Sequence, residues 1–257
     1  MAVLTGDDRR RARPAPAALL PGADRVLAAH PAVLPQPDQL CGPFATRSAL
    51  HALLDRSDVP DLGALALAAG THVWPHDEPA WRPAGAPLRT DAWEDLPRVD
   101  DPDRSGTDAA PLAAGLPGVA PVAVVPVPAV LPGPAVPAAW GRLLVALREA
   151  DHPVAVVANL RTGPTWPPEH PLAGWDVGHF VVLVSFDGEE VGVADSYVEA
   201  GADGWPPGCR GVPLADLVAA LAAPPGRGLL LLAHPAHEQG VRRLVAEAGL
   251  VAAGAAW

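Results

Sequence analysis

Two apolar runs close to residue 190 constrain the fold of this chain more than any other feature of its sequence. The runs, residues 178–186 and residues 191–195, contain most of the valine, leucine and phenylalanine of this region. Asp187 and Gly188 lie between them. Short runs of strand-forming residues on either side of an Asp-Gly pair are typical of a β-hairpin. The sequence therefore predicts an antiparallel sheet built around this hairpin.

The register of the hairpin decides which of its residues face one another. If the loop has three residues, with Gly188 in the left-handed conformation, Ser185 pairs with Glu189. His179 in the first strand then lies directly opposite Asp195, with the two Cβ atoms about 5 Å apart on one face. A two-residue turn instead puts His179 and Asp195 on opposite faces of the sheet, unless a bulge intervenes.

The remaining segments favour a mixture of helices and strands, so the predicted fold class is α+β. The spacing of apolar residues predicts helices over residues 24–29, 41–54, 62–69, 109–115, 140–150, 214–222 and 238–248. It also predicts strands over residues 153–159 and 228–233. Between residues 118 and 137 valine alternates with proline, which favours extended chain at the edge of a sheet.

A single domain is predicted for residues 23–257, after a mobile lead-in over residues 1–22. The lead-in is rich in Arg, Ala and Pro and shows no apolar period. Residues 70–108 also lack a clear period, and loops of that length are usually functional lids or unrecognised structure.

The composition argues against several classes of protein. The net charge is −11, from 18 basic and 29 acidic residues, whereas a surface that binds nucleic acid needs a basic stripe. No stretch approaches the roughly 18 to 20 consecutive apolar residues of a membrane-spanning helix. The first residues lack the ordered regions of a secretory signal, which favours a cytoplasmic protein. Only two cysteines are present, so no disulfide framework is expected.

Cys41 begins one of the predicted helices, and Pro43 suits its first turn because that position needs no N–H donor. A cysteine attacks as its thiolate, which a helix N-terminus favours. The unpaired N–H groups there also offer donors to a developing oxyanion. Gly42 allows close approach, and Gln36 or Gln39 offers a second donor from its side chain. The alternative is that Cys41 is a buried packing residue.

A nucleophilic thiol needs a base within hydrogen-bond reach and a group that orients the base. Of the nine histidines, only His179 begins a predicted strand, and Asp195 ends the strand that returns. The hairpin therefore predicts a triad of Cys41, His179 and Asp195. Taken separately, His179 is also compatible with a solvated histidine at a strand end, and Asp195 with a turn residue.

These residues resemble the papain-like cysteine peptidases, particularly the bacterial C39-like branch. The matching pieces are Gln36, the Cys-Gly-Pro run at Cys41, residues 178–184 and residues 193–195. The resemblance implies a papain-like fold, in which a helix carrying the cysteine packs on an antiparallel sheet carrying His and Asp. The family's oxyanion glutamine usually lies one position further from the cysteine than Gln36 does. Gln36 is preferred over Gln39 as the oxyanion donor, because Gln39 lies only two residues before Cys41 and would be held in the turn that enters the helix.

Two tryptophans lie in the loop that precedes His179. We expect this loop to overhang the site, with Trp166 and Trp175 either forming a wall for the substrate or covering the hydrophobic core. A metal site is not predicted, because no helix or hairpin brings the candidate ligands together; these are His72, His76, Asp77 and Glu78. No cofactor is expected, and Cys209 is interpreted as a surface or packing thiol in a loop.

Three functions remain open at this stage, and a metal-dependent hydrolase is a distant fourth. The first is a cysteine peptidase or amidase that forms an acyl-thioester with a peptide or a small amide. The second uses the same residues for acyl transfer to an amine, as papain-like folds in bacterial biosynthetic pathways do. The third is a binding protein of the same fold with an inert cysteine. The sequence does not separate the first two, because site shape and water exclusion decide the acceptor, and it leaves the oligomeric state open.

Overall fold

The computed structural model describes residues 18–129, 136–224 and 227–254. In these ranges six strands form one antiparallel sheet in the order β1-β6-β2-β3-β4-β5. The strands are β1 (Ala123–Pro128), β2 (Ala155–Arg161), β3 (Gly178–Phe186), β4 (Glu190–Ala194), β5 (Cys209–Pro213) and β6 (Gly228–Ala233). The predicted α+β class is confirmed. Within the valine and proline run, residues 123–128 form the edge strand β1, where missing N–H donors are tolerated.

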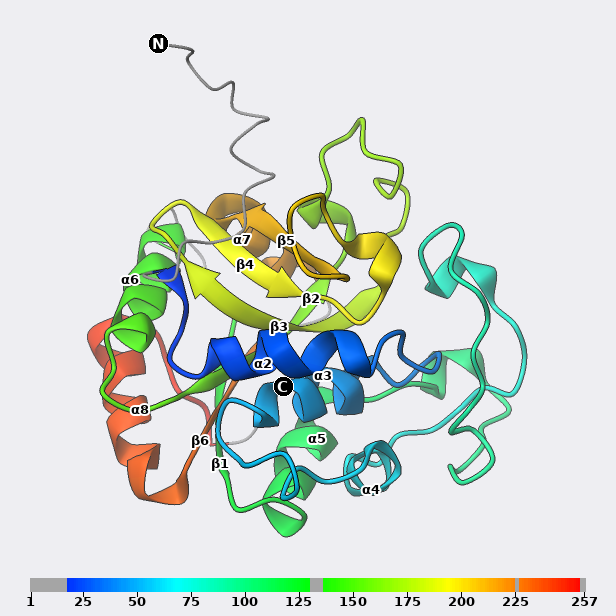
Figure 1. Ribbon diagram of the computed structural model, residues 1–257, viewed down its shortest axis with the longest axis horizontal. Coiled ribbons are helices and arrows are strands. Elements are labelled where there is room, and N and C mark those ends of the chain that lie inside the picture. Colours follow the sequence, from blue (N-terminus) through cyan, green and yellow to red (C-terminus); the bar gives the residue numbers. More distant parts are fainter. Residues whose placement is uncertain (1–17, 130–135, 225–226, 255–257) are drawn as a thin grey trace.

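Seven α-helices accompany the sheet in the described ranges: α2 (Ala23–Ala29), α3 (Cys41–Leu50), α4 (Leu62–Ala68), α5 (Ala109–Gly115), α6 (Val136–Arg148), α7 (Leu214–Ala222) and α8 (Glu238–Glu247). Single 3₁₀ turns cover His30–Ala32, Pro79–Trp81, Pro102–Arg104, Leu116–Gly118, Gly163–Thr165, Val198–Ala200 and Pro235–His237. Helices α2 and α3 lie against β3, whereas α7 and α8 pack on other strands and α6 contacts both of them (Figure 1). None of the described helices is long and apolar enough to cross a membrane.

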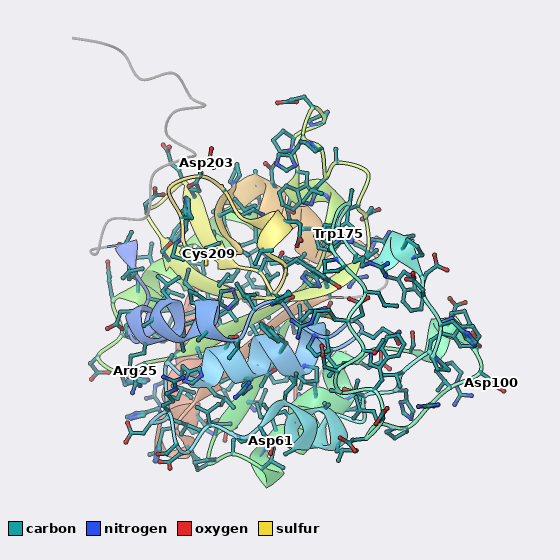
Figure 2. All side chains as sticks on the ribbon, turned by 45° about the vertical axis from the view of Figure 1, so that its right-hand side comes forward. Arg25, Asp61, Asp100, Trp175, Asp203 and Cys209 are labelled. Atoms are coloured by element: carbon teal, nitrogen blue, oxygen red, sulfur yellow. The ribbon has the colours of Figure 1, made fainter. Side chains whose placement is uncertain are left out.

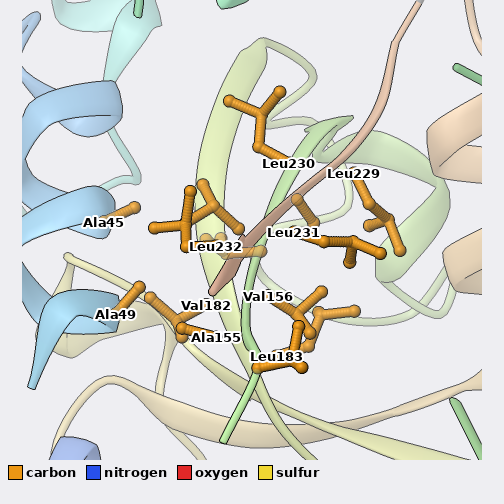
Figure 3. Close-up of a cluster of buried hydrophobic side chains, with 14 of the residues drawn as sticks. Ala45, Ala49, Ala155, Val156, Val182, Leu183, Leu229, Leu230, Leu231 and Leu232 are labelled. Carbon is orange, nitrogen blue, oxygen red and sulfur yellow. The ribbon is translucent and has the colours of Figure 1, made fainter. Parts of the chain in front are cut away.

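The core lies between α3 and the central strands. Every residue of β6 is buried, and its four consecutive leucines place apolar side chains on both faces of the sheet. Ala45 and Ala49 of α3 are small, which lets the helix approach the sheet closely on one side (Figure 3), while further helices cover the other side. This close packing fixes where the first residue of α3 lies relative to the strand ends.

The hairpin of β3 and β4 is confirmed, but its predicted register is wrong. Ser185 pairs with Gly192, not with Glu189. The difference arises in the turn, which covers residues 187–189 instead of 186–188. There the Asp187 carboxylate accepts hydrogen bonds from the backbone N–H groups of Glu189 and Glu190. The register then shifts between Leu183 and Ser185, so that β3 contains a bulge.

Two further expectations need correction. Residues 209–213 form β5, not a loop, and Cys209 is fully buried in it. Residues 18–22, predicted to belong to a mobile lead-in, are packed: Leu19 bridges Ser185, and Leu20 is buried with its N–H donating to the Val184 carbonyl at 3.0 Å. The rest of the predicted lead-in lies outside the described residues.

The segment 70–108 is mostly irregular but well anchored. Two isolated bridges, His72 with Gly106 and Val73 with Arg98, tie its ends together. Trp93 packs in a small hydrophobic cluster and donates its indole N–H to the Asp38 carbonyl at 3.0 Å. Figure 1 shows this segment, in cyan to green, beside the N-terminal end of α3. It therefore forms a wall next to Cys41.

Candidate active site

A cavity of about 1140 Å³ lies at the N-terminal end of α3. Cys41 and His179 both line it, together with residues from the end of β2 and from the irregular segment 70–108. Cys41 is the first residue of α3 and is partly buried. The first N–H groups of a helix have no partners within it. They therefore lie next to the sulfur, as the sequence predicts.

His179 and Asp195 are joined directly, although they are not directly opposite in the sheet. The His179 Nε2–H donates to Asp195 Oδ1 at 2.9 Å. Continuing the register beyond the pair Val182 and Ala194 places Asp195 opposite Val181, two residues from His179. Without the bulge, Asp195 would fall opposite Val182 and on the other face. The bulge thus puts the carboxylate on the same face as the imidazole.

Asp195 is fully buried and receives hydrogen bonds on both carboxylate oxygens. The backbone N–H of Tyr197 also donates to Oδ1 at 3.2 Å, and Arg210 Nη1 donates to Oδ2 at 3.0 Å. Burial raises the pKa of Asp195, but the charges of His179 and Arg210 and their hydrogen bonds outweigh burial and hold it below its usual range. Asp195 is therefore ionised at neutral pH.

His179 lies between Asp195 and Cys41. Its Nε2 is engaged by Asp195. Nδ1 is therefore the nitrogen left to interact with the Cys41 side chain, which contributes to the raised pKa of His179. Burial lowers the pKa of His179, but the charge and hydrogen bond of Asp195, and then those of Cys41, raise it to about 10. The imidazole is therefore protonated at neutral pH and places a positive charge beside the sulfur.

Two residues that support this arrangement were missed in the sequence. His30 is buried, and its Nε2–H donates to the Asp195 carbonyl at 2.8 Å. Burial lowers the pKa of His30 and keeps it neutral, although Asp195 opposes this effect. Arg210 follows Cys209 in β5 and is buried against Trp166, with the guanidinium 4.1 Å from the ring centre. Neither His30 nor Arg210 belongs to a sequence motif. His30 contacts Asp195, and Arg210 contacts Trp166, and in both pairs the residues are far apart in the chain.

The two candidate glutamines have different surroundings. The side chain of Gln39 forms two hydrogen bonds with the Trp74 backbone: Nε2 donates at 2.9 Å and Oε1 accepts at 2.7 Å. Gln36 is buried and lines the cavity. Its Oε1 has no partner among the described residues. Of the two side chains, Gln36 is thus the one whose amide is not fixed to the backbone.

A second buried network lies beside this glutamine. The Tyr197 hydroxyl donates to Asp38 Oδ1 at 3.0 Å, and Arg82 Nη1 donates to Asp38 Oδ2 at 3.3 Å. Burial raises the pKa of Asp38, and the hydrogen bond from Tyr197 and the charge of Arg82 only partly offset it. Because Arg82 belongs to the segment 70–108, this network attaches the wall of the cavity to the residues just before Cys41.

A family model covers residues 20–257 of the chain and describes a family of unknown function, DUF6885. The chain belongs to the DUF6885 family. No curated protein matches it. The span matched by the DUF6885 model includes α3, both strands of the hairpin and the arginine of β5, so that all the site residues described above lie inside it.

The two tryptophans of the DUF6885 protein do not line the cavity, so their assignment as substrate-binding residues is corrected. Trp166 and Trp175 are buried in a hydrophobic cluster with Tyr197. Trp175 meets the His179 ring edge-to-face at 5.3 Å, and its indole N–H donates to the Trp81 carbonyl at 3.3 Å. Figure 2 shows Trp175 where its loop meets the segment 70–108. Trp175 therefore packs against His179, and Trp166 packs against Arg210, which supports Asp195.

Gly42 does not leave open space for a ligand at its Cα in this structure. A Cβ atom there would lie 3.0 Å from two carbons of the Thr107 side chain, so the space beside Gly42 is already filled. Because Gly42 has no side chain, α3 can pack closely against Thr107 of the segment 70–108. In the described ranges no group of three metal-ligating side chains converges. Asp77, one of the candidate ligands considered above, forms an ion pair with Arg82 at 2.6 Å.

Raising the pH is expected to destabilise the DUF6885 protein through His179. Its pKa is near 6.5 when unfolded and is raised to about 10 in the fold. The stabilisation is therefore complete below pH 6.5 and is lost progressively as the pH rises toward 10. Guanidinium unfolding at pH 6.5 and pH 9.5 measures it. The wild type should lose more stability between these values than His179→Gln, and an equal loss would contradict this expectation.

Gly208 is expected to tolerate no side chain. It has φ +74°, and a Cβ atom would lie 2.4 Å from the Asp195 carbonyl oxygen and 3.3 Å from His30 Nε2. Gly208→Ala should cost about 2 to 4 kcal/mol, combining left-handed strain with displacement of Asp195. Gly188→Ala is the control, since it also has positive φ but meets nothing within 4 Å. Thermal unfolding should show the larger loss for Gly208→Ala; equal losses would disprove the contact.

Proposed function

We propose that this DUF6885 protein is a papain-like thiol enzyme, a cysteine peptidase or amidase that works through an acyl-thioester on Cys41. One observation carries the proposal. His179 is buried, is hydrogen-bonded to the ionised Asp195 through one ring nitrogen, and lines the same cavity as Cys41, which begins a helix and contributes to the raised pKa of His179. A nucleophile, a base and a group that orients the base are the parts that thiol catalysis needs.

The architecture supports the same proposal. Helix α3, which begins with Cys41, lies against an antiparallel sheet. His179 lies in strand β3 of this sheet, and Asp195 directly follows strand β4. This is the arrangement implied by the resemblance to papain-like peptidases of the C39-like branch. The buried Asp195 would favour the imidazolium form of His179, and the imidazolium would favour the thiolate of Cys41.

The reaction would proceed in two halves. The Cys41 thiolate attacks the carbonyl carbon of a peptide or amide, and the C–S bond forms while the carbonyl oxygen gains negative charge. The N–H groups at the start of α3 and the side-chain amide of Gln36 stabilise that oxyanion. His179 then donates its Nδ1 proton to the leaving amine as the C–N bond breaks, which leaves a thioester and neutral His179.

The second half returns the enzyme to its starting state. Neutral His179 accepts a proton from water, the oxygen attacks the thioester, and the C–S bond breaks to release a carboxylic acid and the Cys41 thiolate. An amine in place of water would make the enzyme an acyltransferase. One observation favours this second candidate, because acidic side chains line the cavity and would attract a cationic amine. They are Asp38, Glu78, Asp103 and Asp108.

Intact mass spectrometry tests the proposal. The purified wild type, Cys41→Ala and the control Cys209→Ala are each incubated with cell extract and then desalted in acid, which preserves thioesters. We expect an added mass on the wild type and on Cys209→Ala, but none on Cys41→Ala, and that mass identifies the acyl group. An adduct that persists on Cys41→Ala would contradict the proposal. So would alkylation of Cys41 by iodoacetamide as slow as that of an inert thiol.

A further inference from the structure

One end of the cavity carries a positive charge that the proposed chemistry does not use. Arg227 lies just before β6, Asn159 lies in β2, and Gly178 begins β3. They meet at one end of the three neighbouring strands β6, β2 and β3, because Asn159 pairs with Gly228 on one side and with Phe180 on the other. Arg227, Asn159 and Gly178 all line the cavity.

The guanidinium of Arg227 lies close to the reacting groups. A Cβ atom at Gly178 would lie 3.2 Å from each of its terminal nitrogens, so the guanidinium occupies the space above the residue that precedes His179. The side chain also interacts electrostatically with Cys41. A ligand held by Arg227 would therefore lie in the cavity that Cys41 and His179 also line.

The guanidinium is buried without a counter-ion among the described residues. Arg227 is only 7 % exposed. Its Nη1 donates to Asn159 Oδ1 at 2.8 Å, whereas its Nε has no acceptor and its Nη2 donates to no described residue. The neighbouring Arg161 differs, because Asp176 neutralises it with two carboxylate contacts of 2.9 and 2.8 Å. A buried charge that lacks a partner is costly unless a ligand supplies one.

The electrostatics of the cavity point the same way. Burial lowers the pKa of Arg227, and the positive charge of Arg161 lowers it further. The negative charge of Asp176 acts in the opposite direction. An additional anion in the cavity would therefore be stabilised by Arg227, while a neutral group would leave the guanidinium desolvated and unpaired.

We propose that Arg227 determines specificity by binding a carboxylate of the substrate beside the bond attacked by Cys41. Its Nη2 group offers charged N–H donors of the kind that bind a carboxylate. Asn159 holds the Nη1 group. Substrates that lack the carboxylate are rejected because they leave this arginine unpaired. The inference rests on the proposed function for the role of Cys41, but the anion site itself does not require catalysis.

Two alkylating reagents that differ in charge test this site. Iodoacetate and iodoacetamide both form a C–S bond with Cys41 and release iodide, so the ratio of their rates cancels the reactivity of the thiol. We expect Arg227→Gln to lower the ratio of iodoacetate to iodoacetamide by about tenfold, which is about 1.4 kcal/mol. Arg227→Lys should retain part of the preference. Arg161→Gln, a control in the same cavity, should change the ratio by less than about twofold.

An unchanged rate ratio in Arg227→Gln would overturn the proposal. An equal fall of the ratio in Arg161→Gln would also overturn it, because the effect would then come from the overall positive charge of the cavity and not from Arg227. Unchanged thermal unfolding of Arg227→Gln shows that the variant is folded. The absolute rate with iodoacetamide reports on the proposed function separately. A slow rate that does not depend on His179 would contradict that function, while the ratio would still show whether Arg227 selects anions.

A competition arm identifies the source of the carboxylate. N-acetylglycine offers a chain-terminal carboxylate, N-acetylisoglutamine offers an acidic side chain, and N-acetylglycinamide is the neutral control. Each is tested for protection of Cys41 against iodoacetamide at equal ionic strength. Protection by the first assigns a peptide C-terminus as the ligand, and protection by the second assigns an acidic side chain. If neither protects better than the neutral compound, or if protection persists in Arg227→Gln, the proposal is wrong.

Discussion

Asp195→Asn is expected to lower the free energy of unfolding by about 3 to 5 kcal/mol, because it leaves a buried cation without its counter-charge. Arg210 is 3 % exposed, and its contact with Asp195 Oδ2 at 3.0 Å is its only ion pair among the described residues. The asparagine cannot neutralise it. For a chain of 257 residues, each kcal/mol shifts the unfolding temperature by about 2 to 4 °C. Guanidinium unfolding measures the loss directly.

A double-mutant cycle separates this ion pair from general damage. Arg210→Met alone should also destabilise the protein, because it removes one of the two cations that Asp195 faces. The double variant Asp195→Asn/Arg210→Met should lose less stability than the sum of the single variants, by more than about 1 kcal/mol. Additive losses would mean that the two side chains are not coupled. In that case the support for Asp195 described above would be wrong.

His179→Ala is expected to slow the alkylation of Cys41 by about 10- to 100-fold at pH 6. An ordinary thiol with a pKa near 8.5 is well under one per cent thiolate at this pH. An adjacent imidazolium increases the thiolate fraction greatly, and the lower intrinsic nucleophilicity of such a thiolate offsets part of the gain. His76→Ala is the matched control, because His76 lines the same cavity and packs on Trp74.

The measurement is the second-order rate constant with iodoacetamide, followed by peptide mapping of Cys41. His76→Ala should react as the wild type does. If His179→Ala reacts as fast as the wild type, the histidine does not activate the sulfur. If both histidine variants slow alkylation equally, the effect is one of access to the cavity and not of charge.

Local signals explain which parts of the fold could be predicted from the sequence. The Asp-Gly pair identifies the hairpin, and Pro43 with the small residues that follow it identifies α3. These signals act within a few residues of one another, so they are visible in the chain itself. The candidate nucleophile and base were therefore found from their places at the start of a helix and of a strand.

The exact partner geometry depends on contacts that are distant in the chain. The bulge that brings Asp195 onto the face of His179 lies where Leu20 donates to the Val184 carbonyl. Nothing in residues 178–195 records that contact, so the bulge could not be predicted from the hairpin alone. His30 lies 165 residues from Asp195, and its role could not be predicted for the same reason.

The tryptophan loop shows a different limit. Its composition fits either a substrate wall or a cover for the core, and the choice depends on where the cavity lies. In the structure the segment 70–108 closes over Trp175 through Trp81 and buries it. That segment has no periodicity, and the sequence therefore did not show that it would take the place of the tryptophans at the wall of the cavity.

The central claim is that the fold activates Cys41, and one measurement tests it most directly. The rate of iodoacetamide labelling of Cys41 at pH 6 is compared between the native protein and the same protein unfolded in guanidinium chloride. The account predicts that Cys41 reacts at least about tenfold faster in the native state, while Cys209, fully buried in β5, reacts more slowly than when unfolded. If folding protects Cys41 as it protects Cys209, the cysteine is an inert packing residue and the proposed function is wrong.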